Sequence, residues 1–138
     1  KLFPEVTVEE QACPMWVPLV EYGESNAPGA DYFVEKYTSE LMQRDPKIDT
    51  IILGCTHYPL LRLKIREALP ESVELISQGE LVASSLADYL LRHPEMEHRL
   101  SQGGEISYRT TECPEKFEEL ASIFTGTEVR ATRVKITG

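Results

Sequence analysis

The sequence predicts an α/β fold, with a mainly parallel sheet flanked by helices. Two observations lead to this class. Strand-like and helix-like segments alternate along the 138 residues. In addition, the segment DTIILG (49–54) holds an uninterrupted apolar run of two isoleucines and a leucine, which is typical of a strand covered on both faces in a parallel sheet. Because 41% of the residues are apolar and 27% are charged, the composition is that of a globular protein.

The first half of the chain supplies three predicted strands and two predicted helices. The helices carry apolar residues at three- and four-residue spacing. Pro14 and Pro18 argue against a regular helix through both, so their segment is predicted to be an ordered loop. In order, the segments are a strand at 6–10, the loop at 12–24, a helix at 30–44, a strand at 49–54, a helix at 59–70 and a strand at 73–77.

The second half continues the same alternation. Pro114 suits the first turn of a helix and Gly126 suits its C-terminal cap. The predicted segments are a helix at 79–93, a polar surface connection at 94–105, a strand at 106–111, a helix at 114–126 and a strand at 128–136. In such folds ligands bind beyond the carboxyl ends of the strands, so the residues after 49–54 are the first candidates for a site.

The stretch GCTHY (54–58) places a thiol and an imidazole two positions apart, where a predicted strand turns into a predicted helix. At a helix N-terminus the thiolate of Cys55 would be stabilised by the helix dipole, and His57 can accept or return a proton. Thr56 adds a hydroxyl and a backbone N–H suited to a carboxylate. The alternative interpretation is a cysteine that only packs and a histidine that caps the turn.

Glu21 is a second candidate, because it ends the apolar run inside the segment 12–24. A carboxylate in the wall of a cleft could take part in proton transfer or stabilise a charge. A solvated loop carboxylate is the common alternative.

A metal site is not predicted. Cys13, Cys55, His57 and Cys113 could supply a Cys₃His zinc site, but their spacings contain no zinc knuckle. Three widely spaced cysteines do not form a disulfide framework either, and free thiols indicate a cytoplasmic protein.

Charge and hydropathy argue against two classes of partner. The net charge of −9 makes nucleic acid an improbable ligand, since phosphate binding needs a basic surface. No apolar run approaches the roughly 18 residues that a membrane span requires, so no membrane partner is expected.

Three stretches carry a resemblance to a known family: ACPMWVPLVE (12–21), ILGCTHYPLL (52–61) and YRTTECPEKFEELASIF (108–124). Together they resemble the C-terminal half of bacterial glutamate racemases, within the aspartate/glutamate racemase superfamily. The resemblance implies two α/β domains facing a cleft, no cofactor, and a homodimer in the intact enzyme. It also implies interconversion of L-glutamate and D-glutamate by two cysteines on opposite faces of the α-carbon, which supplies D-glutamate for peptidoglycan synthesis.

The resemblance also implies roles for individual residues. Cys55 matches the second catalytic cysteine of the family, which deprotonates L-glutamate. His57 matches the histidine that assists proton transfer at that thiol. Thr56 matches a position that contacts the amino-acid head group of the substrate, and Glu21 matches a carboxylate that supports this side of the cleft.

The sequence departs from the family pattern in one large respect and two small ones. No motif like ACNTA, which holds the first catalytic cysteine, is present. The chain is therefore expected to be truncated and inactive alone, with 1–77 forming most of the second domain and 78–138 completing the first. Ser77 and Cys113 each stand where the family usually has an aspartate, and the helix cap at Cys113 should be weaker by up to about 1 kcal/mol.

Two other functions stay open. One is a non-catalytic α/β fragment or binding module. The other is a superfamily racemase that acts on aspartate or on a hydantoin.

Overall fold

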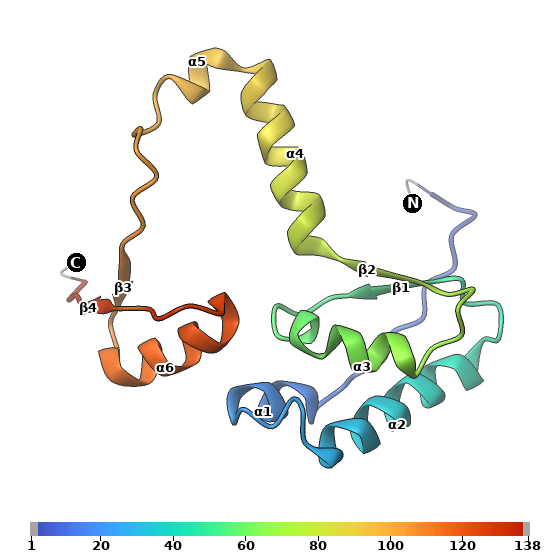
Figure 1. Ribbon diagram of the computed structural model, residues 1–138. Helices are drawn as coiled ribbons and strands as arrows, with labels where there is room; N and C mark the ends of the chain where they lie inside the picture. Colours follow the sequence, from blue (N-terminus) through green and yellow to red (C-terminus); the bar gives the residue numbers. More distant parts are fainter. Residues whose placement is uncertain (1–2, 137–138) are drawn as a thin grey trace. The chain divides into compact units, whose positions relative to one another are not determined.

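The computed structural model describes residues 3–136, and the chain divides into two compact units that meet between Leu81 and Val82. Figure 1 shows the elements of each unit. The elements of the first unit are α1 (Trp16–Glu21), α2 (Pro28–Arg44), β1 (Thr50–Leu53), the 3₁₀ turn η1 (Tyr58–Leu61), α3 (Arg62–Glu67) and β2 (Glu74–Ser77). Helix α4 (Gln78–Arg92) crosses the boundary, and the second unit continues with α5 (Pro94–Glu97), β3 (Tyr108–Thr110), α6 (Pro114–Thr125) and β4 (Ala131–Arg133).

The first unit is built on two parallel strands, β1 and β2, which pair from Thr50 with Glu74 to Leu53 with Ser77. This confirms the prediction of parallel pairing. Coverage differs from the expectation, because α1, α2 and α3 lie on one side of this sheet (Figure 1). Leu53 is buried, whereas Ile52 on the other face is 61% exposed.

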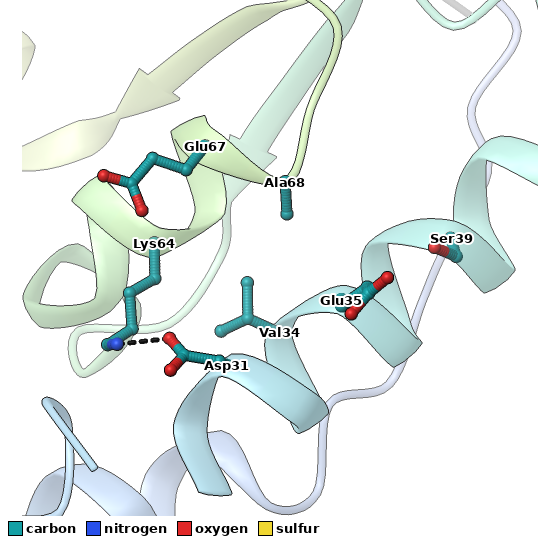
Figure 2. A pocket seen from close by; sticks show the side chains of 7 residues that line it. All are labelled: Asp31, Val34, Glu35, Ser39, Lys64, Glu67 and Ala68. Atoms are coloured by element: carbon teal, nitrogen blue, oxygen red, sulfur yellow. Dashed lines mark hydrogen bonds and ion pairs between the residues drawn. The ribbon is translucent and has the colours of Figure 1, made fainter. Parts of the chain in front are cut away.

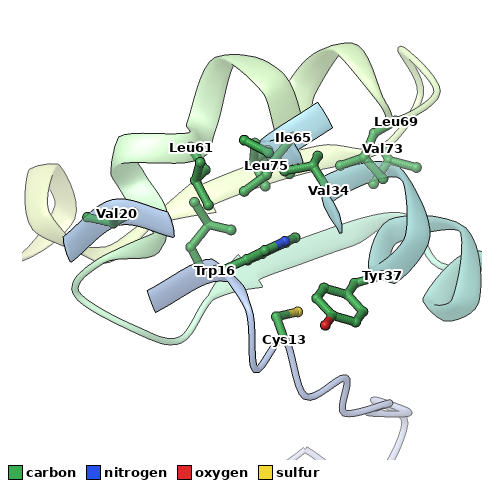
Figure 3. Close-up of a cluster of buried hydrophobic side chains, with 12 residues drawn as sticks. Cys13, Trp16, Val20, Val34, Tyr37, Leu61, Ile65, Leu69, Val73 and Leu75 are labelled. Atoms are coloured by element: carbon green, nitrogen blue, oxygen red, sulfur yellow. The ribbon is translucent and has the colours of Figure 1, made fainter. Parts of the chain in front are cut away.

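The core of the first unit lies between this sheet and its helices (Figure 3). Helix α2 begins at Pro28, whose fixed φ suits a first turn, and it buries Ala30, Val34 and Tyr37 at helical spacing. The complete buried cluster consists of Cys13, Trp16, Val20, Ala30, Val34, Tyr37, Leu53, Leu61, Ile65, Leu69, Val73 and Leu75. These side chains bring α1, η1 and α3 onto the same core.

The predicted helix at 59–70 occurs in two parts. The η1 turn ends at Leu61 and α3 follows directly from Arg62. The chain after α3 is held by the Arg66 guanidinium, which donates to the backbone carbonyls of Leu69, Pro70 and Val73. These bonds hold the segment between α3 and β2 against the helix, and the Pro70 carbonyl also accepts from the Val73 backbone N–H at 3.1 Å.

Two predictions for the N-terminal segment are wrong. The segment 12–24 contains helix α1 rather than only a loop. Pro14 precedes this helix and Pro18 is its third residue, where a backbone N–H has no acceptor within the helix, so neither proline interrupts it. The segment 6–10 is not a strand, because Val6 and Val8 are exposed and the two sheets of the described chain contain only β1 to β4.

The second unit is also organised around two parallel strands. Strands β3 and β4 pair from Tyr108 with Ala131 to Thr110 with Arg133, and helix α6 connects them. Helix α6 ends at Gly126, which has a φ of 68° and therefore serves as the predicted left-handed cap. The predicted connection at 94–105 contains the short helix α5, which begins at Pro94.

The sequence predicts that a whole racemase would assign residues 1–77 to its second domain and residues 78–138 to its first. This division stays a prediction. Among the helices of residues 3–136, none is both long and apolar enough to cross a membrane.

Candidate active site

The candidate site begins at the carboxyl end of β1. The strand ends at Leu53, and the chain turns through Gly54, Cys55 and Thr56 before η1 starts. The turn is closed by the Tyr58 backbone N–H, which donates to the Cys55 carbonyl at 3.3 Å. The polar side chains of this turn therefore lie just beyond the end of a parallel strand, where α/β folds place ligands.

Cys55, His57 and Glu21 form a continuous series of contacts. The Cys55 Sγ lies 3.8 Å from His57 Nδ1, and His57 Nε2 lies 3.3 Å from Glu21 Oε1. Cys55 is partly exposed, and the side chains of His57 and Glu21 are 22% and 46% exposed. The structure thus brings together three of the sequence-predicted residues, including Glu21 from helix α1.

The chemistry of the partners assigns a tautomer to His57. An ionised carboxylate only accepts hydrogen bonds, so the contact with Glu21 favours a proton on Nε2. In the neutral ring Nδ1 is then the acceptor, and it faces the Cys55 thiol. This arrangement can take a proton from the thiol and return it, with Glu21 stabilising the imidazolium in between.

Thr56 lies in the same turn, and its Oγ1 is 3.3 Å from His57 Nδ1. The Thr56 hydroxyl and the Cys55 thiol therefore share one acceptor atom. Because Thr56 is exposed, its hydroxyl is also accessible to a ligand.

The turn differs from the sequence expectation in one respect. Cys55 is followed by a four-residue 3₁₀ turn, and the α-helix begins only at Arg62. The helix dipole acts mainly within the first turn of a helix. The partner that the structure gives the Cys55 thiol is therefore the His57 ring, whose Nδ1 lies 3.8 Å from the sulfur.

The other two cysteines have different surroundings. Cys13 is buried in the core of the first unit, and burial, together with the nearby Glu40 carboxylate, raises the pKa of its thiol to about 12. Cys113 is exposed at the start of α6, where its thiol donates to the Glu115 carboxylate and accepts no hydrogen bond from the backbone N–H groups of the helix. The absent cap bond fits the expected weak cap. Within residues 3–136 no three acidic, cysteine or histidine side chains are arranged to hold a metal ion.

Tyr58 is a neighbour of the site that the sequence prediction did not include. Its ring lies in edge-to-face contact with Trp16, with centroids 4.8 Å apart. Partial burial raises the pKa of its phenol, and the nearby Cys13 and Cys55 raise it further. Trp16 and Tyr58 are far apart in the sequence, so no local sequence pattern predicts this contact.

A shallow groove elsewhere in the first unit lies between α2 and α3 (Figure 2). The Lys64 ammonium from α3 pairs with the Asp31 carboxylate from α2 at its edge. The lining is completed by Val34, Glu35, Ser39, Glu67 and Ala68. None of the sequence-predicted site residues lines this groove.

Known proteins resemble the chain in both sequence and structure. Glutamate racemases from Dinoroseobacter shibae and Shouchella clausii are 40% and 41% identical to it, over 86% and 85% of its length. A crystal structure of glutamate racemase from Thermus thermophilus, in complex with β-chloro-D-alanine, superposes with a TM-score of 0.75 over 91% of the chain at 33% identity. The chain is homologous to part of a glutamate racemase.

The chain matches only part of each racemase. The chain spans about 42% of the Dinoroseobacter racemase, 41% of the Shouchella racemase and 47% of the Thermus racemase structure. A glutamate racemase from Francisella tularensis, solved in complex with D-glutamate, matches with a TM-score of 0.79, 25% identity and coverage of 96% of this chain and 48% of its own. No protein-family model matches the chain.

Proposed function

We propose that this chain carries one proton-transfer face of an enzyme that interconverts L-glutamate and D-glutamate. The observation that carries the proposal is the series Cys55, His57 and Glu21 at the end of β1. Homology to glutamate racemases over most of the chain supports the reaction class. The D-glutamate complex of the Francisella relative supports the substrate.

The reaction at this face requires only proton transfers. His57 Nδ1 accepts the thiol proton of Cys55, which leaves a thiolate and an imidazolium held by Glu21. The thiolate then removes the α-proton of L-glutamate, so that the C–H bond breaks, an S–H bond forms and the electron pair remains on the substrate. In the reverse direction the Cys55 thiol returns a proton to the same face, and we assign the contact with the substrate head group to Thr56.

The opposite face needs a second acid, which we place outside residues 3–136. Cys13 is buried and its pKa is raised to about 12, and Cys113 donates its proton to Glu115, so neither offers a second thiol like Cys55. The chain also spans less than half of its racemase relatives. We therefore propose that it is inactive alone, that no cofactor takes part, and that the whole enzyme supplies D-glutamate for peptidoglycan in the cytoplasm.

Cys55→Ser in the full-length enzyme tests the proposal. Racemisation should fall by about 10³-fold or more in both directions, because each direction uses this thiol, once as base and once as acid. Circular dichroism of glutamate solutions measures both directions. Cys113→Ser is the matched control and should retain activity, since the Cys113 thiol donates to Glu115 and takes no part in the Cys55–His57–Glu21 series.

The isolated 138-residue chain provides a second test of the proposal. Incubated with L-glutamate in D₂O, it should leave the α-proton signal unchanged relative to a protein-free control, because the groups that would close the site around the substrate are proposed to lie outside residues 3–136. Loss of the α-proton signal would show that this face alone binds and deprotonates glutamate, and it would contradict the proposal that the chain is inactive alone. Retained activity of Cys55→Ser would contradict the role of Cys55 and favour a non-catalytic part for this region.

A further inference from the structure

The helix that carries Glu21 is too short to hold itself in place. Helix α1 has six residues and no side-chain cap at its N-terminus. Isolated helices of that length are unstable in water, and tertiary contacts must fix them. The position of the Glu21 carboxylate therefore depends on the side chains that α1 buries.

Trp16 is the largest of those side chains. It is 4% exposed, its indole N–H donates to the Phe33 carbonyl at 3.2 Å, and its ring also contacts Tyr37. Figure 3 shows Trp16 within the core cluster, with Cys13 and Tyr37 beside it. The start of α1 is thus anchored to α2.

Tyr58 connects this anchor to the catalytic turn. It follows His57 directly and opens η1. Its ring meets Trp16 at an interplanar angle of 84° with a centroid separation of 4.8 Å, which is the favourable edge-to-face geometry for an aromatic pair. Trp16 and Tyr58 are therefore a direct contact between the helix of Glu21 and the turn of Cys55 and His57.

The contact between His57 and Glu21, which the Trp16–Tyr58 pair would maintain, is sensitive to small displacements. His57 Nε2 and Glu21 Oε1 are 3.3 Å apart, and a displacement of about 1 Å would move them beyond the range of a direct hydrogen bond. Both side chains are partly exposed, so water would then compete for the carboxylate.

We propose that the aromatic contact between Trp16 and Tyr58 positions Glu21 against His57, which makes Tyr58 a positioning residue for proton transfer at Cys55. This inference rests on the proposed function and adds a residue that acts through Glu21 and His57. The phenol hydroxyl is not required, because the ring makes the contact.

The test measures how fast iodoacetamide alkylates Cys55 in the 138-residue chain at pH 7, with exposed Cys113 as the reference in the same sample and peptide mass spectrometry as the readout. Tyr58→Leu should slow Cys55 relative to Cys113 by at least about threefold, because the imidazole no longer accepts the thiol proton efficiently. Tyr58→Phe should restore the wild-type ratio. A merely structural loosening would expose Cys55 more and would raise its rate instead.

Two controls separate the possible failures. Leu60→Ala removes a partly buried side chain from the same turn and should not slow Cys55. Glu21→Gln should slow Cys55, and adding Tyr58→Leu to it should have little further effect, because the two changes remove one interaction.

If Tyr58→Leu leaves the ratio unchanged or raises it, or if its effect multiplies with that of Glu21→Gln, the positioning role is wrong. If His57→Asn also leaves the rate of Cys55 unchanged, the thiol–imidazole coupling fails and the proposed function loses its main support. If only His57→Asn slows Cys55, the proposed function stands and the positioning role falls.

Discussion

A strand–helix–parallel strand arrangement occurs twice in this chain, and the two copies differ in burial. In the first, β1 and β2 are joined through η1 and α3, and the connecting segment buries Leu61, Ile65 and Leu69. In the second, β3 and β4 are joined through α6, and Val129 is the one buried hydrophobic residue among the described residues from 82 onward. The apolar periodicity of the two connecting helices is similar, so periodicity alone does not determine how much surface becomes buried.

The difference lies in what packs against each copy. The first copy is covered by α1 and α2, which contribute Trp16, Val20, Val34 and Tyr37 to its core. Helix α6 contacts β3 and β4, yet its residues Ile123 and Phe124 are 38% and 39% exposed. A strand–helix–strand arrangement thus forms with modest burial, but a reactive turn held between several elements is found only in the first copy of the described chain.

The largest expected effect comes from the core of the first copy. Ile65 is fully buried, and Ile65→Ala should reduce the unfolding free energy of the first unit by about 3–4 kcal/mol through lost burial and a residual cavity. Urea denaturation followed by the fluorescence of Trp16, the single tryptophan, reports this unit. Leu63→Ala, at an 80% exposed position, should change the value by less than about 0.5 kcal/mol.

The second copy supplies the comparison. Val129→Ala should leave the urea transition seen by Trp16 unchanged, because Val129 belongs to the other compact unit. A common loss of stability in both variants would mean that the two units unfold as one.

A pH dependence of the first unit should follow from Cys13. Its pKa is raised in the folded state from the ordinary value of 9.0 to about 12, so the folded chain retains a proton that the unfolded chain loses. The associated stability is complete below about pH 9 and is lost as pH rises toward 12, at up to about 1.4 kcal/mol per pH unit. Urea midpoints between pH 8.5 and 10 should therefore fall in the wild type.

The variant Cys13→Ala isolates this contribution. Its urea midpoint should be lower at pH 8.5 because a core side chain is truncated, but it should decline less steeply with pH. An equal slope in both proteins would assign the decline to other groups, such as the Tyr58 phenol, whose pKa is also raised by burial.

The smallest effect concerns two glycines. Gly126 caps α6 with a φ of 68°, and Gly126→Ala should destabilise that helix by about 1 kcal/mol, because a side chain is strained in the left-handed region. Gly29 lies in the first turn of α2 with open space at its Cβ position, so Gly29→Ala should stabilise by up to about 1 kcal/mol. Hydrogen exchange of the α6 and α2 amides measures both, and a loss of protection in each would contradict the assignment to backbone conformation.

Much of the fold could be predicted because apolar spacing is a local property. The helices at 30–44 and 79–93 and the strands at 49–54 and 73–77 each correspond to an observed element. Helix α1 could not be predicted in this way. It begins between Pro14 and Pro18, which argue against a helix, and it is held by long-range contacts with α2 and η1.

The same distinction between local sequence patterns and long-range packing applies to the site. Cys55, Thr56 and His57 are adjacent in sequence, and their proximity could be predicted from the motif alone. Glu21 was named from its context, but its 3.3 Å contact with His57 depends on how α1 packs. Tyr58 was missed, because its edge-to-face contact with Trp16 joins segments that no sequence spacing relates.

The Cys55–His57–Glu21 series has a consequence for the time course of folding. Its thiol and imidazole are two positions apart, so bringing them together costs little chain entropy. The contact between Glu21 and His57 closes a loop of dozens of residues and costs more. We expect the turn around Cys55 to form early and the carboxylate to dock later, when α1 packs. A newly made chain would then pass through a stage in which its thiol is exposed to oxidants without its complete proton relay.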